Sequence, residues 1–258
     1  MNRNEIHRAL EEDFKATFIE ELIPGILHNF ANPLNGIMGR TKLLQRRIEE
    51  NFSKIEAIYP EAAAGMMNEM QRIKMDVASV NQEAEYFFDM FKDIAGKFYS
   101  LTTKEEDQIN LSHLLAAEMR FANFYLDFKH EIKKNMQWDN ETPYFKGNTA
   151  DLSLAFWRLI RFAMSGALAS RLREFQIKTD HDHEYINVSI KSSGNALAAF
   201  DTAALIENLH TSSSKTDGII DRGALLSLSL FDQYRAKINI FSEEELGIIS
   251  IGFPYRAE

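Results

Sequence analysis

Apolar side chains recur every three or four residues through the first quarter of the chain. The stripe they form on one helix face consists of positions Leu27, Phe30, Leu34, Ile37, Thr41, Leu44, Ile48 and Phe52. This pattern predicts one long amphipathic helix from about Asp13 to Ile58. Pro24 and Pro33 should interrupt it only softly, since each removes a single backbone donor.

A second apolar seam follows the turn at residues 59–61, and Pro60 suits the start of a helix. Its positions step by three and four without a break: Met70, Ile73, Val77, Val80, Ala84, Phe87, Phe91, Ile94 and Phe98. The seam predicts a helix from Glu61 to Tyr99, and two long helices joined by a short turn make an antiparallel hairpin. Because one hairpin buries two long stripes poorly, we expect a homodimeric four-helix bundle. The alternative is a monomeric hairpin packed on the chain's own second domain.

Beyond residue 100 the pattern changes to short alternating segments. Residues 101–110 are polar and are typical of a linker. Helices are expected at Ser112–Leu126, with Ser112 as the cap, and at Asp151–Ser170, Thr202–His210 and Gly223–Tyr234. Strands are expected at Phe128–Lys133 and Tyr144–Lys146, and in two hairpins, Phe175–Thr179 with Tyr185–Lys191 and Ala236–Phe241 with Gly247–Phe253.

This order indicates an α/β sandwich. The predicted fold class is therefore α+β, with the helical hairpin over residues 1–100, the linker over residues 101–110 and the sandwich domain over residues 111–258.

Composition narrows the choice of compartment and partner. The chain has 258 residues, 45% of them apolar and 26% charged, as globular domains do. Its net charge of −9 disfavours nucleic acid, and the absence of cysteine excludes disulfides and thiolate metal sites. We find no apolar run of about 18 residues and no signal-peptide core, so we expect a cytoplasmic protein without a membrane partner.

Candidate chemistry lies in residues 27–37, Leu-His-Asn-Phe-Ala-Asn-Pro-Leu-Asn-Gly-Ile. His28 is one position off the apolar stripe, about 100° round the helix, where it can meet solvent. Asn32 follows four residues later and shares its face. Pro33 should bend the helix just after the histidine. A lone histidine beside an apolar stripe is ordinarily without function, but this stretch is more specific.

The run His-Asn-x-x-Asn-Pro-Leu resembles the phospho-acceptor box of bacterial sensor histidine kinases, commonly His-Glu-x-x-Asn-Pro-Leu. The resemblance implies that His28 accepts a phosphoryl group and that Asn29 and Asn32 orient the site. Active kinases of this type place an acidic general base directly after the histidine, whereas Asn29 cannot accept a proton. Transfer between a histidine and a partner's aspartate needs only a nucleophilic imidazole and correct placement.

Three segments of the second half resemble the ATP-binding domain of the same family. They are Lys-Gly-Asn-Thr-Ala-Asp-Leu at 146–152, Thr-Ser-Ser-Ser-Lys at 211–215 and Arg-Gly-Ala-Leu-Leu-Ser-Leu at 222–228. The resemblance implies that these segments are, in this order, the lead-in to the first nucleotide helix, the approach to an ATP lid, and the start of the helix that follows the lid.

The positions that would carry ATP chemistry differ from the family. Arg158 and Phe162 replace two asparagines, the second of which holds Mg²⁺, and a phenyl ring cannot ligate a cation that demands oxygen. Ser192 replaces the aspartate that receives the adenine amino group. Gly194 and Gly223 are the glycines that survive, and turn chemistry explains both. We therefore expect no ATP, no other cofactor and no metal.

Two other clusters carry ligand-capable groups. Asp-His-Asp-His-Glu at 180–184 could hold a metal, but it falls where the solvated tip of a hairpin is expected. The arginines Arg158, Arg161, Arg171 and Arg173 could bind an anion, although a solvated helix face explains them more simply.

Taken with the resemblance, these features indicate a histidine phosphotransferase of a two-component phosphorelay, which relays phosphoryl groups between the aspartates of response-regulator receiver domains through His28. One alternative is an ATP-dependent sensor histidine kinase with a divergent ATP site. A second is a non-catalytic dimeric adaptor that binds response regulators.

Overall fold

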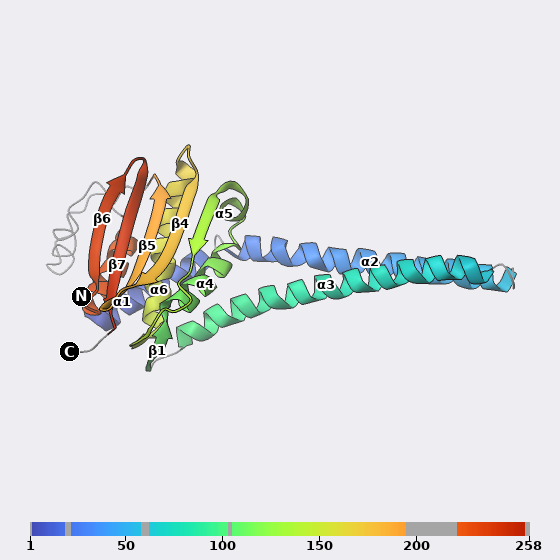
Figure 1. Ribbon diagram of the computed structural model, residues 1–258, viewed down its shortest axis with the longest axis horizontal. Helices are drawn as coiled ribbons and strands as arrows, with labels where there is room; N and C mark the ends of the chain where they lie inside the picture. The colour runs from blue at the N-terminus through green and yellow to red at the C-terminus, as the bar shows by residue number, and fades with distance from the viewer. Residues whose placement is uncertain (1, 19–21, 58–61, 103–104, 195–220, 256–258) are drawn as a thin grey trace. The chain divides into compact units, whose positions relative to one another are not determined.

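The computed structural model describes residues 2–18, 22–57, 62–102, 105–194 and 221–255, in two compact units (Figure 1). We call residues 24–94 the hairpin unit, and residues 1–23 together with 95–258 the sheet unit. This division differs from the expected boundary at residue 100, because the first 23 residues and the end of the second long helix belong to the sheet unit.

The hairpin unit consists of most of two long helices, α2 (Ile23–Ala57) and α3 (Ala62–Thr102). Phe30 of α2 meets Phe87 of α3 with ring centroids 5.1 Å apart, and Arg40 and Arg47 farther along α2 both pair with Asp76. Because later residues of α2 contact earlier residues of α3, the two helices run antiparallel. The described part of the first predicted helix belongs to α1 (Arg3–Thr17) and α2, between which residues 19–21 lie outside the described residues. Pro33 lies within α2.

The sheet unit contains a five-stranded sheet in the order β2-β4-β5-β7-β6. Its strands are β2 (Lys133–Gln137), β4 (Glu174–His181), β5 (Tyr185–Ser193), β6 (Lys237–Glu243) and β7 (Leu246–Pro254). Only the β2–β4 pair is parallel. A separate ribbon pairs β1 (Glu106–Asn110) with β3 (Tyr144–Asn148). Side chains along β4 and β5 alternate between buried and more exposed, so one face of the sheet carries the core.

Helices cover that face of the sheet (Figure 1). They are α4 (Leu111–Ala122), α5 (Leu126–Glu131), α6 (Thr149–Ala169) and α8 (Arg222–Gln233). The centre of the core is aromatic: the ring of Phe156 on α6 lies 4.6 Å from that of Phe231 on α8, and Phe253 of β7 contacts both. Among the described helices, α6 alone is long and apolar enough to cross a membrane, and 61% of that stretch is buried inside the unit. Burial of this extent is typical of a core helix.

Helix α1 packs on the sheet unit against α6 and α8. It begins with a capping box, in which the Asn2 side chain accepts from the amide of Glu5 and the Glu5 carboxylate accepts from the amide of Asn2. Ile6, Leu10 and Phe14 step by four residues and are all buried. This apolar stripe explains why residues 3–17 form a helix and why that helix packs on α6 and α8.

Several predicted elements are confirmed. The two strand hairpins form as β4 with β5 and β6 with β7, and the Tyr144–Lys146 strand forms as part of β3. The two apolar helices form as α6 and α8. The helix expected at Thr202–His210 lies outside the described residues.

Other predictions were wrong. The expected strand Phe128–Lys133 is largely helix α5, in which Phe128 packs edge-on against Phe175, with ring centroids 5.2 Å apart. The expected linker 101–110 holds the end of α3 and strand β1. Asn110, not Ser112, caps α4, because its side chain accepts from the amide of His113 at 2.9 Å.

Candidate functional site

The predicted acceptor His28 lies on α2, in the second turn after the helix begins at Ile23. Its imidazole is outside the described side chains. Asn32, four residues on, is exposed, as its predicted role requires. The predicted helical placement of both residues therefore agrees with the structure, and the geometry of the ring itself stays a prediction.

Asn29, which is predicted to orient the site together with Asn32, is bonded to its own helix. Its side chain is buried, and its amide Nδ2 donates to the carbonyl of Gly25 at 2.9 Å. An amide held against its own helix can brace the turn that carries His28. It cannot serve as a proton acceptor beside it.

Arg158 occupies one of the positions at which the resemblance expects an asparagine, and it lies within an ion-pair network. Its Nε is 2.7 Å from the carboxylate of Asp13 on α1, and its Nη2 donates at 2.7 Å to Asp221, the N-cap of α8. Only 9% of Arg158 is exposed. The predicted solvated helix face is therefore wrong for this arginine, because two carboxylates from outside α6 neutralise it.

Gly223 is required by this network. A Cβ atom at Gly223 would lie 2.0 Å from Nε of Arg158, so the arginine passes directly over the glycine. In the family that this chain resembles, a glycine here lets backbone amides approach phosphates. In this chain the guanidinium group of Arg158 lies against Gly223, and Asp221 adds a carboxylate beside it.

The structure places the other predicted ATP-site positions on α6, on β5 and directly after β5. Phe162 is a half-buried residue of α6, and Ser192 is a buried residue of β5. Gly194 has φ +73°, and a Cβ there would lie 2.4 Å from the carbonyl oxygen of Gly166. Gly194 is therefore fixed by a left-handed turn and by the close approach of α6. The lid segment 211–215 lies outside the described residues.

The acidic and histidine-rich tip at residues 180–184 is used for turn structure. Asp182 accepts from the amides of Glu184 and Tyr185, both at 2.8 Å, and these bonds lower its pKa. His181 contacts the carboxylate of Asp139 at 2.5 Å. Within the described ranges, no three histidine, aspartate or glutamate side chains are grouped so that they could hold a metal ion.

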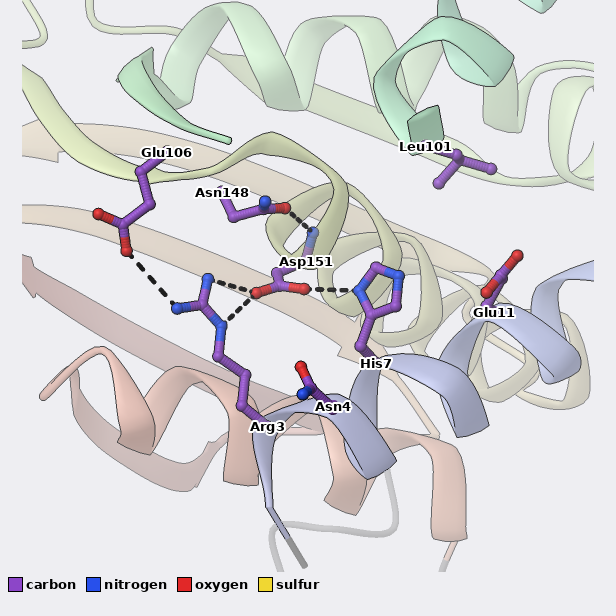
Figure 2. A pocket seen from close by; sticks show the side chains of 8 residues that line it. All are labelled: Arg3, Asn4, His7, Glu11, Leu101, Glu106, Asn148 and Asp151. Carbon is purple, nitrogen blue, oxygen red and sulfur yellow. Dashed lines mark hydrogen bonds and ion pairs between the residues drawn. The ribbon is translucent and has the colours of Figure 1, made fainter. Parts of the chain in front are cut away.

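A second polar cluster, which the sequence reasoning missed, is centred on Asp151 in the first turn of α6 (Figure 2). Arg3 donates from Nε to Asp151 at 2.6 Å, and His7 Nδ1 lies 2.6 Å from the other carboxylate oxygen. Arg3 Nη2 also donates to the hydroxyl of Tyr234 at 2.6 Å. Arg3 and His7 line an open pocket of about 700 Å³ together with Asn4, Glu11, Leu101, Glu106, Asn148 and Asp151.

The charges of this cluster are coupled. Burial would raise the pKa of Asp151, but hydrogen bonds from His7 and Arg3 outweigh it and lower that pKa. The same hydrogen bond raises the pKa of His7 against the opposing effect of burial. Burial raises the pKa of Tyr234 to about 12, so its hydroxyl stays protonated. The available signal was the i, i+4 spacing of Arg3 and His7 beside the apolar stripe of α1.

Comparison with known proteins gives likenesses of fold. No family model matches the chain, and no curated protein matches it. The catalytic domain of histidine kinase ThkA (TM1359), in nucleotide-free form 4, is 17% identical at a TM-score of 0.48; the match covers 60% of this chain and 99% of that one. Nucleotide-free form 3 of the same domain is 17% identical at a TM-score of 0.47, and the match covers 58% of this chain and 98% of that one. The Acinetobacter baumannii histidine kinase AdeS is 10% identical at a TM-score of 0.43, and the match covers 84% of this chain and 96% of that one.

Proposed function

We propose that this protein is a histidine phosphotransferase of a two-component phosphorelay, in which His28 takes a phosphoryl group from the aspartate of one receiver domain and passes it to another. In the accepting step a ring nitrogen of His28 attacks phosphorus, the P–O bond to the aspartyl carboxylate breaks, and the carboxylate leaves. In the donating step the aspartate carboxylate of the second receiver attacks phosphorus, the P–N bond to His28 breaks, and the imidazole leaves. The partner's own metal would supply electrophilic help, so this chain needs no cofactor.

The observation that carries the proposal is the position of Arg158. A nucleotide site of the family type needs oxygen ligands for Mg²⁺ and free backbone amides for phosphate. Here Arg158 lies over Gly223 and is held there by Asp13 and Asp221. A protein whose own side chains fill that space is better suited to receive phosphoryl groups from another protein than from ATP.

The direct test is transfer of label. Receiver domains from the same organism, carrying a radiolabelled acyl phosphate, are incubated with the purified chain. We expect acid-labile label to appear on this chain during the incubation. Binding of the receivers without label would favour the adaptor alternative.

Titration with ATP and Mg²⁺ separates the proposal from the kinase alternative. We expect no saturable heat in a calorimetric titration, because Arg158 and Phe162 stand where the family has asparagines. A receiver domain titrated into the same preparation is the control for competent protein. Saturable micromolar binding at one site per chain would instead support an ATP-dependent kinase.

We also propose that the protein is a homodimer through α2 and α3. Val77 lies on the apolar seam of α3, yet 39% of it is exposed in the single chain, and a second hairpin would cover it. Light scattering should report twice the chain mass of 29.7 kDa. Val77→Glu should shift the protein toward monomer, whereas Met75→Glu, which is off the seam and 64% exposed, should not. A wild-type monomer at micromolar concentration would contradict the dimer.

A further inference from the structure

Helix α1 is attached to the sheet unit by two kinds of contact. Its apolar residues Ile6, Leu10 and Phe14 are buried, and this contact does not depend on pH. Its polar residues Arg3 and His7 lie one turn apart and both reach the carboxylate of Asp151 (Figure 2). The second kind of contact includes a titratable partner, so part of the attachment responds to protons.

His7 is placed so that its proton can exchange with solvent. Its side chain is 30% exposed and lines the pocket of about 700 Å³, whereas the side chain of its partner Asp151 is 6% exposed. Nδ1 of His7 contacts Asp151 at 2.6 Å, and Nε2 is the ring nitrogen that takes no part in this contact. The site therefore joins a buried, fixed carboxylate to a ring that water can reach.

The charged groups that face His7 come from each element around the pocket. On α1 these are Arg3 and Glu11, the latter paired with Lys15 at 2.7 Å. Strand β1 contributes Glu106, which lies 3.6 Å from Arg3. Helix α6 contributes Asp151, and Tyr234 at the end of α8 is joined to Asp151 at 3.3 Å. Acidic groups outnumber basic ones here, which favours a charged imidazole.

We propose that α1 is a proton-sensitive strap: the ion pair between His7 and Asp151 helps to hold α1 on the sheet unit, and loss of the His7 proton weakens that hold. This inference does not depend on whether His28 accepts a phosphoryl group.

The direction of the pH response follows from linkage. The pKa of His7 is raised in the folded chain above its ordinary value of 6.5. Its contribution to docking is thus fully present below 6.5 and is lost as the pH rises through the folded pKa. Asp151 moves the other way, but its lowered pKa keeps it ionised throughout that range. Arg3 stays charged, so docking weakens and is not abolished.

Hydrogen exchange of the full chain tests the strap. Protection of the α1 amides, corrected for intrinsic exchange, should fall roughly two- to fivefold from about pH 6 to about pH 8.5, the size expected of a partly exposed ion pair. Protection of α6 should stay constant over the same range. A parallel fall in α6 would show a general loss of stability and would overturn the proposal, as would constant protection of α1.

Two variants assign the response to the correct histidine. His7→Gln should give α1 protection that no longer changes with pH and that matches the high-pH wild type. His113→Gln is the matched control, because His113 is an exposed histidine of α4 in the same unit, and it should behave as wild type. If His7→Gln keeps the full wild-type response, another group is responsible and the strap is not gated by His7.

Discussion

His28→Ala should lose all acceptance of phosphoryl groups from phosphorylated receiver domains. The proposed transfer forms a bond between phosphorus and a ring nitrogen, and alanine offers no nucleophile in its place. The substitution should leave α2 intact, since alanine has the highest helix propensity. The measurement is acid-labile radiolabel on this chain after incubation with labelled receivers, with helix content checked by circular dichroism.

Two further variants sharpen this result. His28→Gln should also abolish labelling, because an amide nitrogen is not nucleophilic. Asn32→Ala should keep some transfer at an altered rate, since Asn32 is exposed one turn after His28 and would act only by orienting the reactants. His113→Ala, on the sheet unit, is the matched control and should label as wild type. Equal label on wild type and His28→Ala would show that His28 is not the acceptor.

The long helices could be predicted because their pattern is local. The apolar steps of three and four in α2 and α3 require no knowledge of distant residues, and the hairpins β4–β5 and β6–β7 are equally local signals. Helix α5 could not be told from a strand for the same reason: six residues hold too few periods to separate a helix from a strand. In the structure, packing of Phe128 against Phe175 accompanies the helical form.

The placement of α1 was beyond sequence reasoning because its contacts are long-range. Arg3 and Asp151 are 148 positions apart, and His7 is 144 positions from the same carboxylate. No periodicity links such residues, so the apolar stripe of α1 predicts a helix but does not predict the unit on which that helix packs. The sequence did point to Arg158 and Gly223 as altered ATP-site positions. It did not indicate that the arginine would be buried between two carboxylates.

A buried ion pair in the sheet unit carries the largest expected effect on stability. Lys97, near the end of α3, donates from Nζ to Glu118 of α4 at 2.8 and 2.6 Å and to the hydroxyl of Ser153 of α6 at 2.7 Å. Burial lowers the pKa of Lys97, and the charge of Glu118 opposes that shift. The Nζ atom also lies 5.2 to 5.8 Å from the ring centroids of Phe14, Phe121 and Trp157. Four helices of the sheet unit therefore meet at this one ammonium group.

Lys97→Met should destabilise the sheet unit by about 3–5 kcal/mol, because it leaves the Glu118 carboxylate buried without its counter-charge. The double variant Lys97→Met with Glu118→Leu should recover much of that loss, since an apolar pair of similar volume removes the uncompensated charge. Thermal unfolding followed by circular dichroism measures both, and Lys92→Met, an exposed lysine of α3, is the control for the substitution itself. If Lys97→Met unfolds at the same temperature as Lys92→Met, the buried pair contributes nothing to the stability of the fold, and the packing of the three rings around Lys97 must hold these helices together without it.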